Sequence, residues 1–362
     1  MRAKKNRAKI DTLFVFGAGV SKSLTNTKIQ SDRTTPLDSE FTTRIKEVKT
    51  SRNHKWVNEA RLRILNDWKH HIEFHEFGFE KAISQQISDL DFLKAIYPKK
   101  GNLGRSEIDY LEDISHITSY ILSQARLNEK KTVNKFINKF FDDEIDDCKN
   151  RIITFNYDTL IDKFIIDKYK DYNKIYFDSI HAFRRAKTKK TNFKKPLILK
   201  LHGSINWKCD KNDYAKVFLN KPTETIRRTK TYNTEGCHFI DKIWIDKRIE
   251  NPGNDIFPFI IPPIPDKPIT NISIFRYLWT YAFEYLIECR ELVISGYSLP
   301  ETDNLAISLF SKFENKHLSK ITIIDPAPET VVKWNNLFNR KGITNPKIEY
   351  YSDFGSYVRS NC

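Results

Sequence analysis

The amino-acid sequence predicts an α/β fold with a doubly wound, mainly parallel sheet, a helical insertion and a second, irregular insertion. Two observations carry this prediction. Short apolar segments rich in β-branched and aromatic residues recur along the 362-residue chain, and each is followed by a polar or glycine-bearing turn. Helical patterns lie between these segments, as they do in chains that pack helices on both faces of a parallel sheet.

The expected strands are short and bounded by polar or turn residues. They are 12–16 (TLFVF), 151–155 (RIITF), 196–203 (PLILKLHG), 292–296 (LVISG) and 320–325 (KITIID). The expected helices are 36–48, 157–169, 277–292, 302–313 and 328–338. In the last of these, apolar residues recur at helical spacing and predict one buried stripe.

The same pattern divides the chain into a core and two insertions. Residues 1–54, 149–205 and 276–362 carry the strand–turn–helix repeats and are expected to form a Rossmann-like core. Residues 55–148 hold two long helix-like stretches, which predicts a helical insertion. Residues 206–275 are basic and then proline-rich, so an irregular insertion is expected there.

The charge of the chain favours anionic partners. Its 61 Lys and Arg residues exceed its 46 Asp and Glu residues, which gives a formal net charge of +15. Residues 181–200 carry eight basic residues and no acidic one, so we expect an exposed run that binds nucleic acid non-specifically. A lysine-rich, solvated surface would explain the same charge.

The five cysteines form no C-x-x-C pair, and this argues against a zinc site or a disulfide framework. We therefore expect no zinc and a reducing compartment. No apolar run approaches the roughly 20 residues of a membrane helix. The apolar burst after the basic leader is interrupted by Gly17 and Gly19 and lacks a cleavage site, so a cytoplasmic protein without membrane contact is expected.

Polar residues follow each expected strand at the edge where parallel sheets bind ligands. Gly17, Ala18, Gly19 and Ser21 follow the first strand, and glycines there let a backbone approach a phosphate near a helix start. A tight strand-to-helix turn would need the same glycines. Asn156 and Asp158 follow the second strand, where Asp158 could instead cap a helix.

Three further turns complete the set. His202 precedes Gly203 at the end of the third strand, where a catalytic role competes with that of an ordinary structural histidine. Gly296 and Ser298 follow the fourth strand. Asp325 ends the fifth, a place from which an acidic residue commonly binds a ribose diol.

The motifs GAGVS (17–21), TFNYD (154–158), LHGSINW (201–207) and SGYSLPETD (295–303) resemble, in this order, those of the sirtuin fold. The resemblance is closer to the sirtuin-like domains of prokaryotic anti-phage defence systems. It implies NAD binding, with the pyrophosphate at Gly17, Ala18, Gly19 and Ser21 and the adenosine half at Gly296, Ser298 and Asp325. It further implies that Asn156 positions the nicotinamide ribose or a water, that Asp158 grips the carboxamide and that His202 is the base near the ribose.

Two departures from protein-deacylating sirtuins set the expected activity. The paired C-x-x-C motifs of their zinc module are missing, and the segment 36–41 (PLDSEF) has no arginine where those enzymes carry one. The resemblance to the defence-type domains then implies an NAD hydrolase that releases ADP-ribose and nicotinamide. A protein deacylase and a non-catalytic module that binds NAD, ADP-ribose or DNA are the alternatives.

Such an activity would need control, because unchecked NAD hydrolysis is toxic. We expect a homo-oligomer or a separate regulatory partner. The resemblance raises a hexameric DNA-translocase-type ATPase as one candidate partner.

Overall fold

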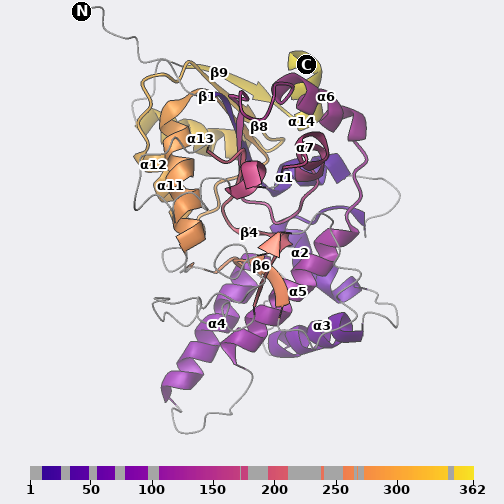
Figure 1. Ribbon diagram of the computed structural model, residues 1–362. Coiled ribbons are helices and arrows are strands. Elements are labelled where there is room, and N and C mark those ends of the chain that lie inside the picture. The colour runs from indigo at the N-terminus through magenta and orange to yellow at the C-terminus, as the bar shows by residue number, and fades with distance from the viewer. Residues whose placement is uncertain are drawn as a thin grey trace, which may run out of the picture.

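A computed structural model describes residues 10–25, 33–48, 55–69, 78–96, 106–171, 173–177, 195–210, 238–239, 256–264, 267, 273–340 and 346–362. Its main element is a six-stranded parallel sheet (Figure 1). In spatial order the strands are β3 (Ile198–Lys200), β2 (Arg151–Thr154), β1 (Ile10–Phe16), β7 (Cys289–Ser295), β8 (Lys320–Ile324) and β9 (Lys347–Tyr351).

This order confirms the predicted fold class. Numbered along the chain within the sheet, the six strands lie in the order 3-2-1-4-5-6, which is the Rossmann order. Every neighbouring pair is parallel. The order reverses between β1 and β7, so the turns that leave these two strands share one place at the carboxyl edge of the sheet.

Helices cover both faces of the sheet (Figure 1). On one face lie α11 (Ser273–Glu288), α12 (Asn304–Lys312) and α13 (Pro328–Arg340). On the other lie α1 (Ala18–Thr25), α6 (Lys130–Phe140), α7 (Asp162–Tyr169) and α14 (Phe354–Asn361). The sheet is therefore doubly wound, as predicted.

An aromatic cluster joins β1 to the second of these helical layers. The ring centroids of Phe14 and Phe136 lie 4.9 Å apart, and those of Phe16 and Phe354 lie 5.6 Å apart. All four side chains are buried. Edge-to-face pairs of this kind fix β1, and with it the turn that leaves β1, at the centre of the molecule.

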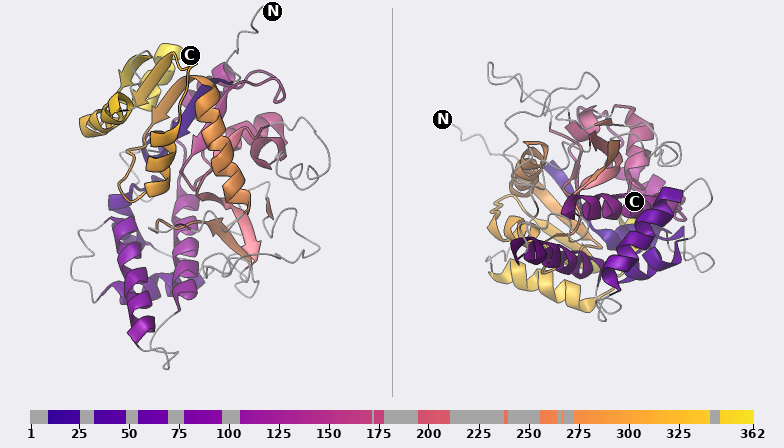
Figure 2. Two further views of the ribbon diagram at one scale, coloured as in Figure 1. Left: turned by 90° about the vertical axis from the view of Figure 1, so that its left-hand side faces the viewer. Right: turned by 90° about the horizontal axis from the view of Figure 1, so that it is seen from below.

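A separate group of helices lies beyond the carboxyl ends of the strands. It contains α2 (Asp38–Glu47), α3 (Lys55–Trp68), α4 (Phe79–Ile96) and α5 (Glu107–Gln124) (Figures 1 and 2). A two-pronged ion pair between Arg63 and Asp113, at 2.7 and 2.8 Å, joins α3 to α5. The hydroxyl of Thr302, in the turn after β7, donates to Glu80 at the start of α4. The helical group therefore contacts the edge at which ligands of such sheets bind.

The second expected insertion is not wholly irregular. Its described residues include an antiparallel sheet with strand order β5 (His238–Phe239), β4 (Gly203–Asp210) and β6 (Ile256–Ile260). The polar run between β4 and β6 concealed this pairing. Of the basic run 181–200, residues 195–200 are described and the rest lie outside the described residues. Lys200 is fully buried, contrary to the prediction of an exposed run, because it pairs with buried carboxylate and carbonyl groups.

Several element boundaries differ from the predicted ones. α7 begins at Asp162, five residues later than expected, because an extended turn precedes it. A short π-helical segment, η4 (Asn173–Phe177), follows α7. α11 ends at Glu288 because β7 begins at Cys289. β9 and α14 were not predicted. Within the described ranges, none of the helices has the length and apolar character needed to cross a membrane.

Candidate active site

The turns after β1 and β7 touch through glycine. The Gly17 amide donates to the Ser295 carbonyl at 3.0 Å, and the Gly19 amide donates to the Gly296 carbonyl at 2.9 Å. A Cβ on Gly19 would lie 2.7 Å from the Gly296 Cα, and Gly296 itself has φ +59°, which favours glycine. The glycines at these positions are thus required by the close approach of two backbones. Ala18, at the start of α1, is exposed beside this contact.

Asn156, Ser21 and Asp158 form a directed hydrogen-bond chain. The Asn156 Nδ2 donates to the Gly17 carbonyl and to the Ser21 Oγ, both at 2.9 Å. The Ser21 Oγ donates in turn to the Asp158 Oδ2 at 2.7 Å. The two accepting groups fix which end of the Asn156 amide faces them. In the described part of the chain no donor reaches the Asn156 Oδ1, and this side chain is only half-buried.

Asp158 is buried with both carboxylate oxygens engaged. Its Oδ1 accepts from the Leu160 amide at 3.1 Å, and its Oδ2 accepts from Ser21. Burial raises the pKa of this carboxyl, against the lowering effects of the Lys200 charge and the Ser21 hydrogen bond. The helix-cap interpretation is wrong, because α7 begins four residues later and Ile161 stands at its N-cap. Asp158 therefore orients Ser21.

A buried lysine supports the turn that carries these residues. The Lys200 Nζ donates to the Asp158 carbonyl and contacts the Asp162 Oδ2 at 3.0 Å. The Tyr176 hydroxyl donates to the same Asp162 oxygen at 2.7 Å. Because the Lys200 charge is fully enclosed and paired, its contacts fix the turn after β2 in one geometry.

His202 lies in a buried charged group, where sequence patterns gave no partner for it. Its Nε2 is 3.3 Å from the Lys267 Nζ and 3.4 Å from the Asp303 Oδ2. The Lys267 Nζ lies 3.0 Å from the Asp303 Oδ1, and the Tyr297 hydroxyl donates to the Asp303 Oδ2 at 3.0 Å. The side chains of His202, Lys267 and Asp303 are 7%, 3% and 3% exposed.

Burial sets the charge state of the histidine. Burial, together with the nearby Lys267 charge, lowers the pKa of His202 to about 3, although Asp303 acts in the opposite direction. Burial also raises the pKa of Asp303, but His202, Lys267 and the Tyr297 hydrogen bond outweigh it, and that pKa lies below its ordinary value. At neutral pH the group is thus a neutral imidazole beside an ion pair.

Aromatic stacking connects the turn after β2 to the turn after β7. The rings of Phe155 and Tyr297 stack in parallel within 3°, with their centroids 4.0 Å apart. The rings of Phe155 and His202 meet edge to face, with their centroids 5.3 Å apart. This stack brings the His202 group next to the Asn156 chain, because Phe155 immediately precedes Asn156. Three of the predicted motifs therefore meet at one edge.

The structure does not bring every predicted residue into this network. Ser298 is exposed in the turn after β7. Asp325 lies after β8, and its Oδ1 accepts from the Ala327 amide at 2.9 Å, so it shapes its own turn. Burial raises the pKa of Asp325. Among the described residues, neither side chain bonds to Asn156, Ser21 or Asp158.

Sequence patterns missed Asp303, Lys267 and Lys200 as members of this site. Asp303 is the last residue of the quoted motif SGYSLPETD, so its place in that motif was the signal that could have found it. Lys267 comes from the proline-rich stretch and offered none. The described residues include no group of three His, Cys, Asp or Glu side chains that could hold a metal ion, and Cys237 lies outside them.

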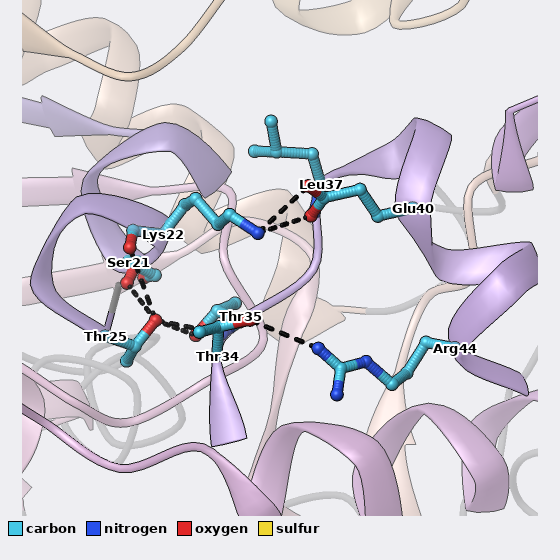
Figure 3. A network of polar contacts seen from close by, with 8 residues as sticks. All are labelled: Ser21, Lys22, Thr25, Thr34, Thr35, Leu37, Glu40 and Arg44. Carbon is cyan, nitrogen blue, oxygen red and sulfur yellow. Dashed lines mark hydrogen bonds and ion pairs between the residues drawn. The ribbon is translucent and has the colours of Figure 1, made fainter. Parts of the chain in front are cut away.

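Polar contacts attach α1 to the segment before α2 (Figure 3). The Thr25 Oγ1 donates to the Ser21 carbonyl at 2.8 Å and accepts from the Thr35 amide at 2.9 Å. The Lys22 Nζ contacts both oxygens of Glu40, at 2.9 and 2.7 Å. These contacts hold the helix that carries Ser21 against Thr35 and Glu40.

Comparisons with known proteins point to one domain. No curated protein matches the chain in sequence. Among solved structures, a Sir2 bound to the inhibitor EX-527, 2′-O-acetyl-ADP-ribose and a deacetylated p53 peptide is 13% identical, with 97% of this chain and 91% of that chain covered and a TM-score of 0.34. A structure on sirtuin substrate affinity and a Sir2–p53 peptide–NAD⁺ complex are each 12% identical with the same coverage, at TM-scores of 0.37 and 0.36.

These structural likenesses are distant, so the fold assignment rests on the strand order of the sheet. A family model described as the SIR2-like domain matches residues 150–242. That segment contains Asn156, Asp158 and His202. The comparisons therefore show a likeness to the SIR2-like domain over residues 150–242, which is less than half of the chain.

Proposed function

We propose that the chain is an NAD hydrolase that cleaves the nicotinamide glycosidic bond and releases ADP-ribose and nicotinamide. The observation that carries the proposal is the meeting of the Gly17–Gly19 and Gly296 turns, at the reversal of strand order, beside Asn156 and His202. The reversal point of a Rossmann sheet is the usual place for a dinucleotide. The match of the SIR2-like domain over the segment that holds Asn156 and His202 adds support.

The residues present fit a dinucleotide. Glycine backbones at the turn after β1 leave no Cβ between the two turns, and the start of α1 at Ala18 is exposed. The start of α1 suits a pyrophosphate through the helix dipole, which favours negative charge there, while the Gly17 and Gly19 amides donate to the Ser295 and Gly296 carbonyls. Gly17, Ala18 and Gly19 would line that group, and Ser21 would support Asn156 behind them. Gly296 and Ser298 would lie on the adenosine side, with Asp325 farther along the edge.

Cleavage of the nicotinamide bond depends on the positions of the ribose and the attacking water more than on acid catalysis. Nicotinamide leaves as a neutral molecule with the electron pair of its bond to C1′, through an oxocarbenium-like transition state. Water forms the new C1′–O bond and loses a proton to solvent. Asn156 suits the placement of that water or of the ribose, because its amide is fixed through Nδ2 and its Oδ1 remains to accept a hydrogen bond.

We also propose that the activity is gated, as a defence effector would require. Hydrolysis of the cellular NAD pool is toxic without control. Homo-oligomerisation or a separate partner, such as a hexameric DNA-translocase-type ATPase, would supply the control. The resemblance in the sequence motifs supports this part of the proposal.

Incubation with NAD, alone and with candidate partners, tests the activity. Equal amounts of nicotinamide and ADP-ribose should form, and Asn156→Ala should abolish most of the turnover in a folded protein. Asn336→Ala, an exposed position on α13, is the matched control and should keep full turnover. Nicotinamide release that depends on an acylated peptide would instead identify a deacylase.

A further inference from the structure

The charged group around His202 contains one contact that restricts the proton on the imidazole. The Lys267 Nζ lies 3.3 Å from the His202 Nε2. An ammonium group has three donors and no acceptor. A proton on Nε2 would therefore point one donor at another, so the Nε2 facing Lys267 must present its lone pair.

The competing contact has the poorer geometry. The Asp303 Oδ2 lies 3.4 Å from the same nitrogen without hydrogen-bond geometry, and the Asp303 Oδ1 faces Lys267 at 3.0 Å. A proton on Nε2 aimed at Asp303 would still lie beside the ammonium. The ion pair thus selects between the two neutral forms of the ring.

We propose that the Lys267–Asp303 ion pair fixes His202 as the neutral tautomer with its proton on Nδ1, so that Nδ1 is a hydrogen-bond donor and not a base. The tautomer assignment itself does not depend on the proposed function; only its consequence for NAD hydrolysis rests on that function. Lys267 and Asp303 act through His202 and are positioning residues.

The surroundings of the imidazole favour the same conclusion. The charged groups that face it are Lys267, from the segment after β6, and Asp303, from the start of α12. The other neighbours are the neutral rings of Phe155, Tyr157 and Trp279. Glu80 of α4 lies within electrostatic reach of both members of the ion pair. Burial keeps the pKa of His202 far below neutrality, so the ring stays neutral at physiological pH.

Nitrogen-15 NMR of the histidine-labelled full chain tests the proposal without relying on turnover. The chain has nine histidines, and the His202 signals are those that vanish in His202→Asn. We expect the wild-type signals to show a proton on Nδ1 and no titration from about pH 5.5 to about pH 8, across the ordinary histidine range. A proton on Nε2, or titration near the ordinary pKa, overturns the proposal.

Two lysine variants separate the ion pair from burial alone. Lys267→Met leaves Asp303 beside His202, so the imidazole should become protonated and titrate above its wild-type value. Lys267→Arg keeps the charge and should retain the wild-type signals. A folded Lys267→Met protein with unchanged signals overturns the role of Lys267. If Lys267→Met does not fold, the wild-type protein and Lys267→Arg still test the proposal. A Lys267→Arg protein whose His202 lacks the Nδ1 proton would contradict the role of the Lys267 charge.

Turnover gives an independent comparison. If the chain hydrolyses NAD, its rate should lack an acidic limb near the ordinary histidine pKa, and Lys267→Met should acquire one. A chain that shows the expected tautomer but no turnover with NAD would contradict the proposed function and leave the tautomer assignment intact.

Discussion

Single side chains at the carboxyl edge of the sheet have fixed hydrogen-bond directions. The Gly17 carbonyl accepts only, so it orients the Asn156 amide, and the Asp158 carboxylate orients the Ser21 hydroxyl. Asn156 is thereby held by a carbonyl and a hydroxyl, each of which is itself fixed. Asp158 contributes through this chain, which differs from the direct grip on a carboxamide that the resemblance implied.

Ser21→Ala should reduce both stability and turnover. Removing the hydroxyl leaves the buried Asp158 Oδ2 without its donor and costs about 1–3 kcal/mol in the free energy of unfolding. NAD hydrolysis should fall about 10²-fold, because Asn156 loses one of its two anchors. Denaturant unfolding and product assays measure the two effects.

Ser23→Ala is the control, since among the described residues the Ser23 hydroxyl bonds only to the Val20 carbonyl of its own helix. Its stability should stay within about 0.5 kcal/mol of wild type. A Ser21→Ala protein as stable and active as Ser23→Ala would contradict the role of the hydrogen-bond chain.

Substitutions of His202 distinguish a hydrogen-bond donor from a base. The amide nitrogen of asparagine can take the place of a protonated Nδ1, but asparagine cannot accept a proton. His202→Asn should therefore retain clearly more NAD hydrolysis than His202→Ala. If His202 were a base, both variants would lose about 10²–10⁴-fold in rate, and equal losses would contradict the assignment.

At the scale of elements, the site depends on two turns that touch. The turns after β1 and β7 meet where Gly19 and Gly296 leave no room for side chains. Parallel pairing of β1 with β7 over six residues keeps these turns in register. The aromatic stack of Phe155 on Tyr297 adds the turn after β2 to the same assembly.

Gly19→Ala should loosen this contact. The added Cβ would meet the Gly296 backbone, which cannot move aside as a side chain can, so the free energy of unfolding should fall by about 1–3 kcal/mol. NAD binding should weaken with it, as titration calorimetry would show.

Gly355→Ala serves as the glycine control. A Cβ there would lie 3.1 Å from the ends of the Arg359 and Asp353 side chains, which can adjust. Because the position is helical, alanine should change stability by at most about 1 kcal/mol, in the favourable direction. Equal destabilisation of the two variants would show that the turn contact has no special role.

The buried strands could be predicted from sequence because each is a short apolar run. β1, β2, β7 and β8 lie in the middle of the sheet, where both faces are covered, and their residues are almost all buried. β9 is one of the two edge strands, and unlike the buried edge strand β3 its sequence KIEYY mixes charged with aromatic residues that stay partly exposed. Without burial on both faces it left no comparable pattern.

The candidate site could be predicted only where its residues directly follow strands. Asn156, Asp158 and His202 do so, and the sheet brings them together. Lys267 reaches His202 from 65 residues away along the chain, out of a proline-rich segment with no periodic pattern. A contact of that kind depends on the tertiary fold, and no local signal in the sequence reports it.

At the scale of the whole molecule, the buried His202 group predicts a stability that depends on pH. The folded-state pKa of His202 is about 3, below the ordinary value of 6.5, so between these values the unfolded chain binds more protons. The free energy of unfolding should therefore fall as pH drops below 6.5, with His202 contributing up to about 1.4 kcal/mol per pH unit.

Asp303 acts in the same direction only at lower pH, because its lowered pKa gives stability that is lost as its carboxylate becomes protonated, below its ordinary value of 3.8. Denaturant unfolding of wild type and His202→Asn between pH 7 and about pH 5 measures the His202 effect. The variant should show a shallower decline. Parallel declines in the two proteins would contradict a neutral, buried His202.

Product analysis after incubation with NAD tests the central claim most directly, with binding of NAD measured on the same samples. The wild-type chain, alone or with its activating partner, should bind NAD and release nicotinamide and ADP-ribose in equal amounts. Asn156→Ala should still bind NAD and release little of either product. A folded wild-type chain that neither binds nor cleaves NAD, or an Asn156→Ala protein with full turnover, would contradict the account.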